Sequence, residues 1–75
     1  MPINTKIVTI KEFYKRNSYQ IELVCDDGEY VVDRDGNINL YYLAYGIGCD
    51  LPMRAALHID TSHNQVIEIN VIGKV

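Results

Sequence analysis

The sequence is short of the residues on which several classes of protein depend. Its 75 residues include no tryptophan, one phenylalanine, two prolines and two cysteines. Two cysteines are too few for a small secreted scaffold held together by several disulfides. No apolar run approaches the roughly 18 residues that a membrane-spanning helix needs. Seven basic against ten acidic residues give a net charge of −3, which disfavours non-specific binding to nucleic acid.

The N-terminal residues 1–6 lack the apolar core of a signal peptide and the arginine and serine of a transit peptide. We therefore expect a cytoplasmic protein that does not enter a membrane. In that compartment Cys25 and Cys49 are reduced, although the sequence leaves a disulfide between them open. Because the chain is about half as long as a typical domain, we expect one domain over residues 1–75.

The apolar composition favours strands over helices. Isoleucine and valine total 17, whereas leucine, alanine and methionine total 10. β-Branched side chains lose rotamer freedom in helices and pack well on pleated sheets. The sequence therefore predicts a mainly β fold, with a single small antiparallel sheet or partly open barrel of five to six short strands. The prediction allows one short helix within residues 40–57, and an α+β fold is its alternative.

Residues 19–33 give the clearest local signal, that of a β-hairpin. If Asp27 and Gly28 are the two turn residues, glycine supplies the positive φ that such a turn needs. This register gives the pairs Leu23 with Val32, Cys25 with Tyr30, Glu22 with Asp33, and Asp26 with Glu29. One face of the hairpin is then apolar, formed by Tyr19, Ile21, Leu23, Cys25, Tyr30 and Val32.

Residues 38–57 fit two patterns, a further strand or a helix, and residues 50–57 also suit the start of a short helix. A three-residue loop over residues 35–37 continues the sheet and places Leu40 opposite Val32, which we predict. The alternative is a helix with Asn39 as its N-cap. Its apolar stripe consists of Leu40, Leu43, Ala44 and Ile47.

Two further strands are predicted near the ends of the chain. A five-residue loop over residues 61–65 joins strands whose facing residues are all apolar. Its pairs are Ile59 with Ile67, Leu57 with Ile69, and Ala55 with Val71, and its second strand covers residues 66–73. Residues 6–14 are also strand-like. There the adjacent Ile7 and Val8 indicate a bulge or burial on both sides.

Acidic residues concentrate in the first hairpin, where residues 22–35 hold six acids and one base. The predicted register sets pairs of carboxylates directly opposite each other, which destabilises a sheet, and a basic partner would relieve that repulsion. A solvated surface that keeps small β proteins apart is the plain alternative. We predict a partner-binding surface that contains Glu22, Asp26, Glu29 and Asp33.

Six tyrosines are too many to bury in so small a core, so we expect some of them to be exposed. Tyrosine is enriched in protein interfaces because it combines a flat contact surface with a hydroxyl group, although it is also simply a good strand residue. We add Tyr41 and Tyr45 to the predicted partner-binding surface.

No motif indicates catalysis or a bound metal. The chemistry-bearing residues Cys25, Cys49, His58 and His63 lack the spacing of a zinc site. Nothing orients Cys49 as a nucleophile beside either histidine. Gly46 and Gly48 lack the third glycine of a nucleotide-binding loop, so we assign them to flexibility or turn geometry. We predict no enzyme, no cofactor and no catalytic, cofactor-binding or metal-binding residue.

These observations predict a small non-enzymatic protein-binding module, an adaptor or inhibitor, whose partner is a larger protein with a basic surface patch. The alternative is a small β-barrel that binds single-stranded nucleic acid by stacking bases on tyrosines. Its phosphate contacts would be Lys6, Lys11, Lys15 and Arg16, but the net charge counts against it. A domain of this size buries only about 60% of its unfolded surface, so we also expect a homodimer.

Overall fold

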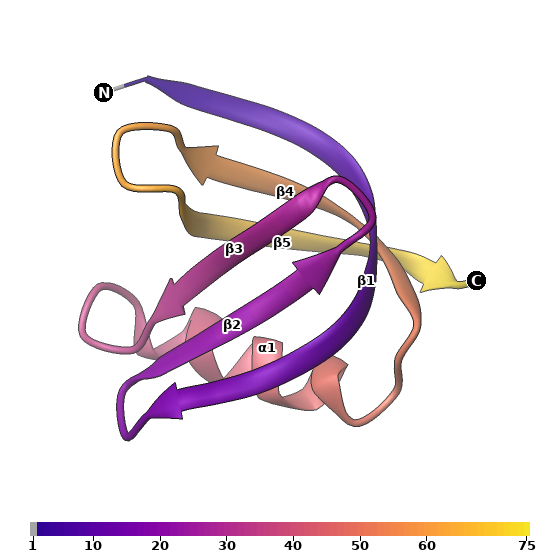
Figure 1. The fold of residues 1–75 in the computed structure, drawn as a ribbon, viewed down its shortest axis with the longest axis horizontal. Coiled ribbons are helices and arrows are strands. Elements are labelled where there is room, and N and C mark those ends of the chain that lie inside the picture. Colours follow the sequence, from indigo (N-terminus) through magenta and orange to yellow (C-terminus); the bar gives the residue numbers. More distant parts are fainter. Residues whose placement is uncertain (1) are drawn as a thin grey trace.

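A computed structural model describes residues 2–75, which form five strands and one helix (Figure 1). The elements are β1 (Ile3–Asn17), β2 (Gln20–Cys25), β3 (Gly28–Asp33), α1 (Ile38–Gly48), β4 (Met53–Asp60) and β5 (Gln65–Lys74). The strands pair in the order β1-β2-β3-β5-β4, and β4 pairs back with β1, so one mixed sheet closes into a small barrel. The prediction of a mainly β fold with a short helix is confirmed.

Neighbouring strands are antiparallel except β3 and β5, which run parallel and share the single pair Val31 with Gln65. The long β1 pairs with β4 along its first half and with β2 along its second half. Helix α1 connects β3 to β4 and lies below the barrel in Figure 1. Strands β1 to β3 are consecutive neighbours and β4 returns beside β1, which is a Greek-key arrangement.

The irregularity predicted in the N-terminal strand is a bulge at Lys11, which lies between two registers of the β1–β2 pair. Before the bulge, Val8 and Ile10 are buried in the barrel and Ile7 is exposed. After it, the inward position falls on Phe13, which packs against the core. Because a bulge bends and twists its strand, β1 can pair with β4 along its first half and with β2 along its second half.

Strands β2 and β3 form the predicted hairpin, but the predicted register is wrong by two residues. The turn consists of Asp26 and Asp27, and Gly28 begins β3 with a φ of 152°. Asp26 anchors the turn on β1: its carboxylate accepts from the Thr9 N–H at 3.2 Å, and its own N–H donates to the Thr9 carbonyl at 3.1 Å. A two-residue shift preserves the face of every side chain. The predicted inward residues are accordingly buried, except Tyr19, which is exposed in the β1–β2 turn.

Residues 38–48 form a helix, so the predicted strand is wrong and the helical alternative is confirmed. The free edge of β3 is occupied by β5 at Gln65, which leaves no place for a further hairpin strand. The N-cap is Asn37 rather than Asn39, because the Asn37 side chain accepts from the Leu40 N–H at 3.1 Å. The buried residues of α1 are Leu40, Tyr41, Ala44 and Ile47, whereas Leu43 is exposed.

The β4–β5 hairpin follows most of the predicted register. Its connecting loop has four residues, 61–64, and Ile59 pairs with Val66 rather than Ile67 because a bulge lies at this end of β5. Asn64 ends the loop with a φ of 55°, a conformation that asparagine tolerates. The predicted pairs Leu57 with Ile69 and Ala55 with Val71 are confirmed.

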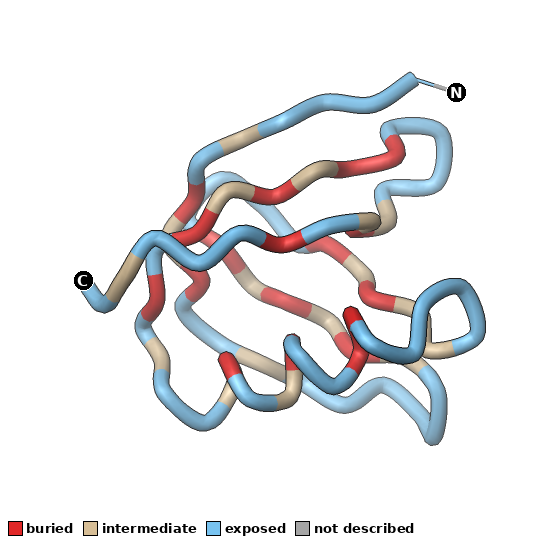
Figure 2. The backbone as a smooth tube through the Cα atoms, turned by 180° about the vertical axis from the view of Figure 1, so that it is seen from behind, coloured by how far each residue is buried: buried red, intermediate tan, exposed pale blue. Residues whose placement is uncertain are grey.

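The core lies inside the barrel and between the barrel and α1. Figure 2 shows buried positions alternating along the strands, as expected for strands with one face inward. The largest fully buried side chains are Val8, Ile10, Ile21, Leu23, Val32, Leu57 and Ile59. Within residues 2–75, no helix has both the length and the apolar character needed to cross a membrane.

Candidate interaction surface

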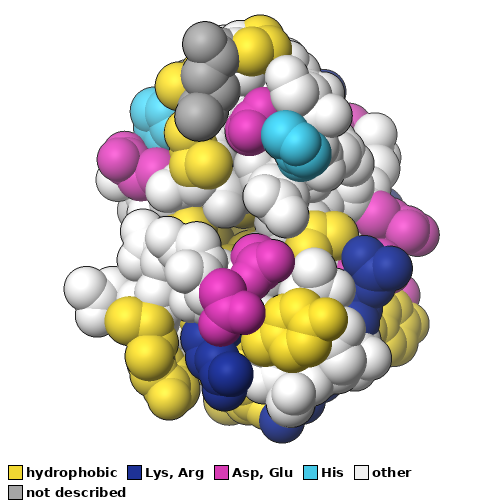
Figure 3. All heavy atoms as spheres, turned by 90° about the vertical axis from the view of Figure 1, so that its left-hand side faces the viewer, with side chains coloured by type: hydrophobic (Ala, Val, Ile, Leu, Met, Phe, Trp, Pro, Cys, Tyr) yellow, Lys and Arg dark blue, Asp and Glu magenta, His cyan; other side chains and the backbone are white. Residues whose placement is uncertain are grey.

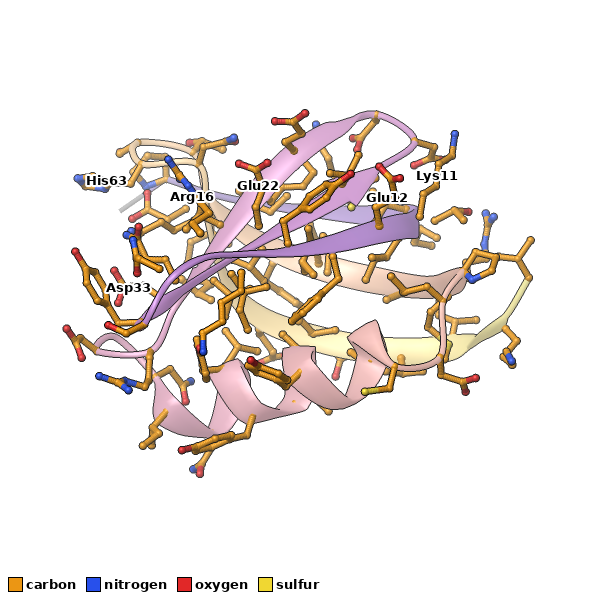
Figure 4. All side chains as sticks on the ribbon, turned by 60° about the horizontal axis from the view of Figure 1, so that its bottom comes forward. Lys11, Glu12, Arg16, Glu22, Asp33 and His63 are labelled. Atoms are coloured by element: carbon orange, nitrogen blue, oxygen red, sulfur yellow. The ribbon has the colours of Figure 1, made fainter. Side chains whose placement is uncertain are left out.

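The outer face of β1, β2 and β3 brings acidic side chains together around an exposed tyrosine. The strand pairings set the outward residues in two rows, Glu12–Val24–Glu29 and Tyr14–Glu22–Val31. Glu12 and Glu22 project from the sheet on the side away from α1 (Figure 4). Tyr14 is 51% exposed, and its hydroxyl donates to Glu12 Oε2 at 3.0 Å. We call Glu12, Tyr14, Glu22 and Glu29 the tyrosine–glutamate face.

The electrostatics of this face are set by its three carboxylates. The hydrogen bond to Glu12 and the negative charge of Glu12 raise the pKa of Tyr14, and desolvation and the charges of Glu22 and Glu29 add to the rise, so the phenol stays neutral. Of the three glutamates, only Glu22 has an ion-pair partner in the described part of the chain, the Arg16 guanidinium at 4.0 Å. The face therefore keeps a net negative charge around an aromatic ring.

The four predicted acidic residues divide between this face and structural roles. Glu22 and Glu29 belong to the face, whereas Asp26 anchors the β2–β3 turn on β1. The Asp33 carboxylate accepts from the Asp35 N–H at 2.9 Å and from the Gln20 amide at 3.3 Å. The predicted pairing of carboxylates directly opposite each other is wrong, because valines lie opposite both glutamates in the observed register.

The two tyrosines predicted for the partner-binding surface differ in their exposure to solvent. Tyr41 is only 4% exposed, since it lies on the face of α1 that packs on the barrel, so its prediction as a surface residue is wrong. Tyr45 is half-buried, with its ring 5.2 Å from that of Phe13 and Lys15 Nζ 5.9 Å from its ring centre. The exposed tyrosine beside the acidic residues is Tyr14, which sequence reasoning missed because the bulge at Lys11 changes which residues of β1 point outward.

The four basic residues of the nucleic-acid alternative have different surroundings. Lys6 Nζ lies 3.2 Å from Asp27, and hydrogen bonds to Tyr30 and Asp27 raise the pKa of Lys6. Arg16 pairs with Glu22, and Lys15 lies over an aromatic ring. Lys11 lies at the bulge. Figure 3 shows the end of the barrel that carries the β4–β5 loop, where acidic and basic side chains are interspersed with apolar ones.

The side chains capable of nucleophilic or metal chemistry have separate surroundings. His58 contacts the Thr5 hydroxyl at 3.2 Å and Glu68 at 3.3 Å. His63 lies 3.3 Å from Asp60, a carboxylate whose pKa is lowered chiefly by the Ser62 N–H. Across residues 2–75, no group of three or more histidine, cysteine, aspartate or glutamate side chains is placed to hold a metal ion.

The two cysteines are both free thiols, and they should differ in reactivity. Burial inside the barrel, helped by the nearby Asp27 and Asp26, raises the pKa of Cys25 to about 12, which keeps it a protonated thiol. Cys49 is exposed after α1. At about pH 8 we expect a thiol reagent to modify Cys49 alone in the folded protein and both cysteines after unfolding. Peptide mass spectrometry locates the adduct, and rapid labelling of Cys25 in the folded protein would contradict its burial.

A hollow at the seam between β3 and β5 has a volume of about 150 Å³. Ligand pockets usually span about 300–1,000 Å³, so this hollow is small for a binding pocket. It is lined by Asp33, Gly36, Asn37, Gln65, Val66 and Ile67.

Comparison of the chain with protein-family models, curated proteins and solved structures finds no match. The guide to function is therefore the exposed surface of the barrel itself.

Proposed function

We propose that the protein is a small non-enzymatic protein-binding module, an adaptor or inhibitor, that binds a basic patch on a larger protein. The observation that carries the proposal is the exposed Tyr14 among Glu12, Glu22 and Glu29. An exposed aromatic ring offers contact area at low entropic cost, and carboxylates without cationic partners favour a positively charged surface. The half-buried Val24 and Val31 add apolar area between the glutamates.

The architecture supports the same face by analogy. OB barrels share this five-stranded Greek-key arrangement, and in them the face of the second and third strands, with the loops 1–2 and 4–5, binds oligonucleotides and oligosaccharides. Here those strands carry Glu22 and Glu29, with Glu12 beside them on β1. Carboxylates repel phosphates and attract lysine and arginine side chains. The architecture therefore suggests which face binds, and the charge of that face favours a basic protein as the partner.

A cytoplasmic location accompanies this proposal, since both cysteines are free thiols and reduced thiols are typical of that compartment. Single-stranded nucleic acid is the alternative ligand, because exposed tyrosines on a barrel also suit base stacking. Titration with an oligothymidylate at low salt separates the two ligands. We expect no binding, and binding that weakens steeply as salt is added would favour the nucleic acid.

The main test compares three immobilised forms of the protein as baits in a lysate of the source cells. They are the wild type, the face variant E12Q/E22Q/E29Q and the control variant D35N/D50N/E68Q. Each triple substitution removes three negative charges and brings the formal net charge from −3 to 0. The control residues are exposed and lie outside the tyrosine–glutamate face, so only the face variant neutralises that face.

We expect a partner that binds the wild type and the control variant and is lost from the face variant. With the purified partner, the face variant should associate more slowly and with a flatter salt dependence, because rim charges chiefly steer association. Tyr14→Ala should instead speed dissociation, as loss of a buried aromatic contact does. A partner that binds all three forms equally well would show that the tyrosine–glutamate face is only a solvated surface.

A further inference from the structure

The first half of β1 has an unpaired edge, which forms the upper border of the molecule in Figure 1. Residues 3–10 of β1 pair with β4 without interruption, whereas β2 pairs with β1 only from Ile10 onward. The backbone groups of Thr9 point away from β4, because both bond to Asp26 in the β2–β3 turn. Alternate residues of an antiparallel ladder face the same side, so the N–H and C=O groups of Ile3, Thr5 and Ile7 point the same way as those of Thr9.

This open edge carries exposed apolar side chains. In the described part of the chain, no strand pairs with Ile3, Thr5 or Ile7 on the side away from β4. Their side chains share the outer face of the barrel, where Ile3 is 53% and Ile7 is 60% exposed. An exposed apolar edge of this kind is a template for another strand. The open segment ends at Thr9, where Asp26 already occupies both backbone groups.

We propose that this edge binds the same edge of a second copy of the chain, as an antiparallel pair about a two-fold axis at Thr5. In this register each Thr5 faces the other Thr5, and each Ile3 faces an Ile7. Lys6 faces the neutral Asn4, so no like charges meet. Apolar pairs and threonine pairs at directly opposite positions stabilise a sheet. The contact joins the β1, β4 and β5 strands of two barrels into one continuous sheet.

The side chains disfavour the other two-fold registers. An axis at Lys6 brings two ammonium groups directly opposite each other, which destabilises the pair. An axis at Ile7 requires the backbone of Thr9, which is already bonded to Asp26. An axis at Asn4 pairs each Ile3 with Thr5 and loses both isoleucine pairs. The inference does not rest on the proposed function, because the tyrosine–glutamate face lies beyond the bulge on β1 and on β2 and β3.

Sedimentation equilibrium of the wild-type chain is the first test. A five-residue strand pair buries less area than the roughly 1,000 Å² of a stable interface, so we expect a dissociation constant in the micromolar range. Between about 10 μM and about 1 mM, the mass should therefore rise from 8.6 kDa towards twice that value. A mass of 8.6 kDa at every concentration would overturn the proposal.

Charge substitutions test the register. Ile3→Glu and Ile7→Lys each set a charge opposite an isoleucine in both symmetric pairs, and each should weaken the dimer about tenfold or more. The double variant I3E/I7K sets the new carboxylate opposite the new ammonium group and should regain most of the lost affinity. Ile72→Lys is the matched control, because Ile72 is a 56% exposed isoleucine on β5. This variant should dimerise like the wild type. A double variant no tighter than its single variants, or dissociation by Ile72→Lys, would overturn the register.

Hydrogen exchange of the wild-type chain tests the interface without any substitution. The amides of Thr5 and Ile7 should exchange slowly at about 1 mM and rapidly at about 10 μM, because only the dimer gives them acceptors. The amides of Lys6 and Val8 point towards β4 and should stay protected at both concentrations. Exchange of Thr5 and Ile7 that does not depend on concentration would overturn the proposal, whatever the variants do.

Discussion

Replacing Leu23 with alanine should remove most of the stability of the fold. Leu23 is fully buried in β2, with Phe13 opposite it on β1 and Tyr30 opposite it on β3. Truncation loses the transfer energy of the deleted carbons and leaves a cavity, and together these cost about 2–5 kcal/mol for a buried leucine. Small domains have total stabilities of only about 5 kcal/mol or slightly more, so the variant should be partly unfolded at room temperature.

Val24→Ala is the matched control, because Val24 is the next residue of β2 and lies half-buried on the opposite face. It should cost less than about 1 kcal/mol. The buried Val32 and the half-buried Val31 offer a second such pair on β3. Urea unfolding should be measured at low micromolar concentration, so that association does not add to the stability of the wild type. Equal unfolding midpoints within each pair would contradict the assignment of the two faces.

The faces of the first hairpin could be predicted from sequence, but its register could not. Apolar residues alternate with polar ones along β2, and any slip by two residues leaves that alternation unchanged. The register is decided at the turn, where Asp26 makes two hydrogen bonds to Thr9. Those bonds join residues 17 positions apart, so no local pattern contains them.

The choice between strand and helix over residues 38–48 also depends on distant residues. Both periodicities are present in the sequence, and the strand is excluded because Gln65 already occupies the edge of β3. The orientation of α1 is a second tertiary effect. Leu43 and Tyr41 both flank the stripe formed by Leu40, Ala44 and Ile47, and the packing of α1 on the barrel buries only Tyr41.

Two of the four residues of the tyrosine–glutamate face could be predicted from the sequence. Glu22 and Glu29 follow from the hairpin pattern, which indicates the outward positions of β2 and β3. Glu12 and Tyr14 come from β1, where the bulge at Lys11 reverses the alternation. Nothing in the composition of residues 6–14 marks Lys11 as the extra residue, so the sequence cannot show which side chains of β1 join the acidic residues of the hairpin.

Gly48→Ala should be destabilising, although alanine is the better helix former. A Cβ atom at Gly48 would lie 2.7 Å from Cγ and Cδ2 of Phe13 and 3.2 Å from its Cβ. These atoms include the root of the side chain, so the ring cannot escape by moving its far end alone. Either β1 or α1 must shift, and overpacking of this kind costs about 1–3 kcal/mol. The glycine is therefore required for the close approach of α1 to β1, and not for the flexibility or turn geometry that the sequence indicates.

Gly46→Ala in the same helix should instead stabilise the fold. A Cβ atom there meets nothing within 4 Å, and Gly46 is exposed. Alanine is favoured over glycine in a helix by about 1 kcal/mol, so this substitution should raise the thermal unfolding temperature while Gly48→Ala lowers it. Phe13→Ala combined with Gly48→Ala should cost less than the sum of the two single substitutions, because alanine lacks the Cγ and Cδ2 atoms of the clash. If both glycine variants were more stable than the wild type, helix propensity alone would decide the outcome. That result would contradict the close contact between the C-terminal end of α1 and Phe13.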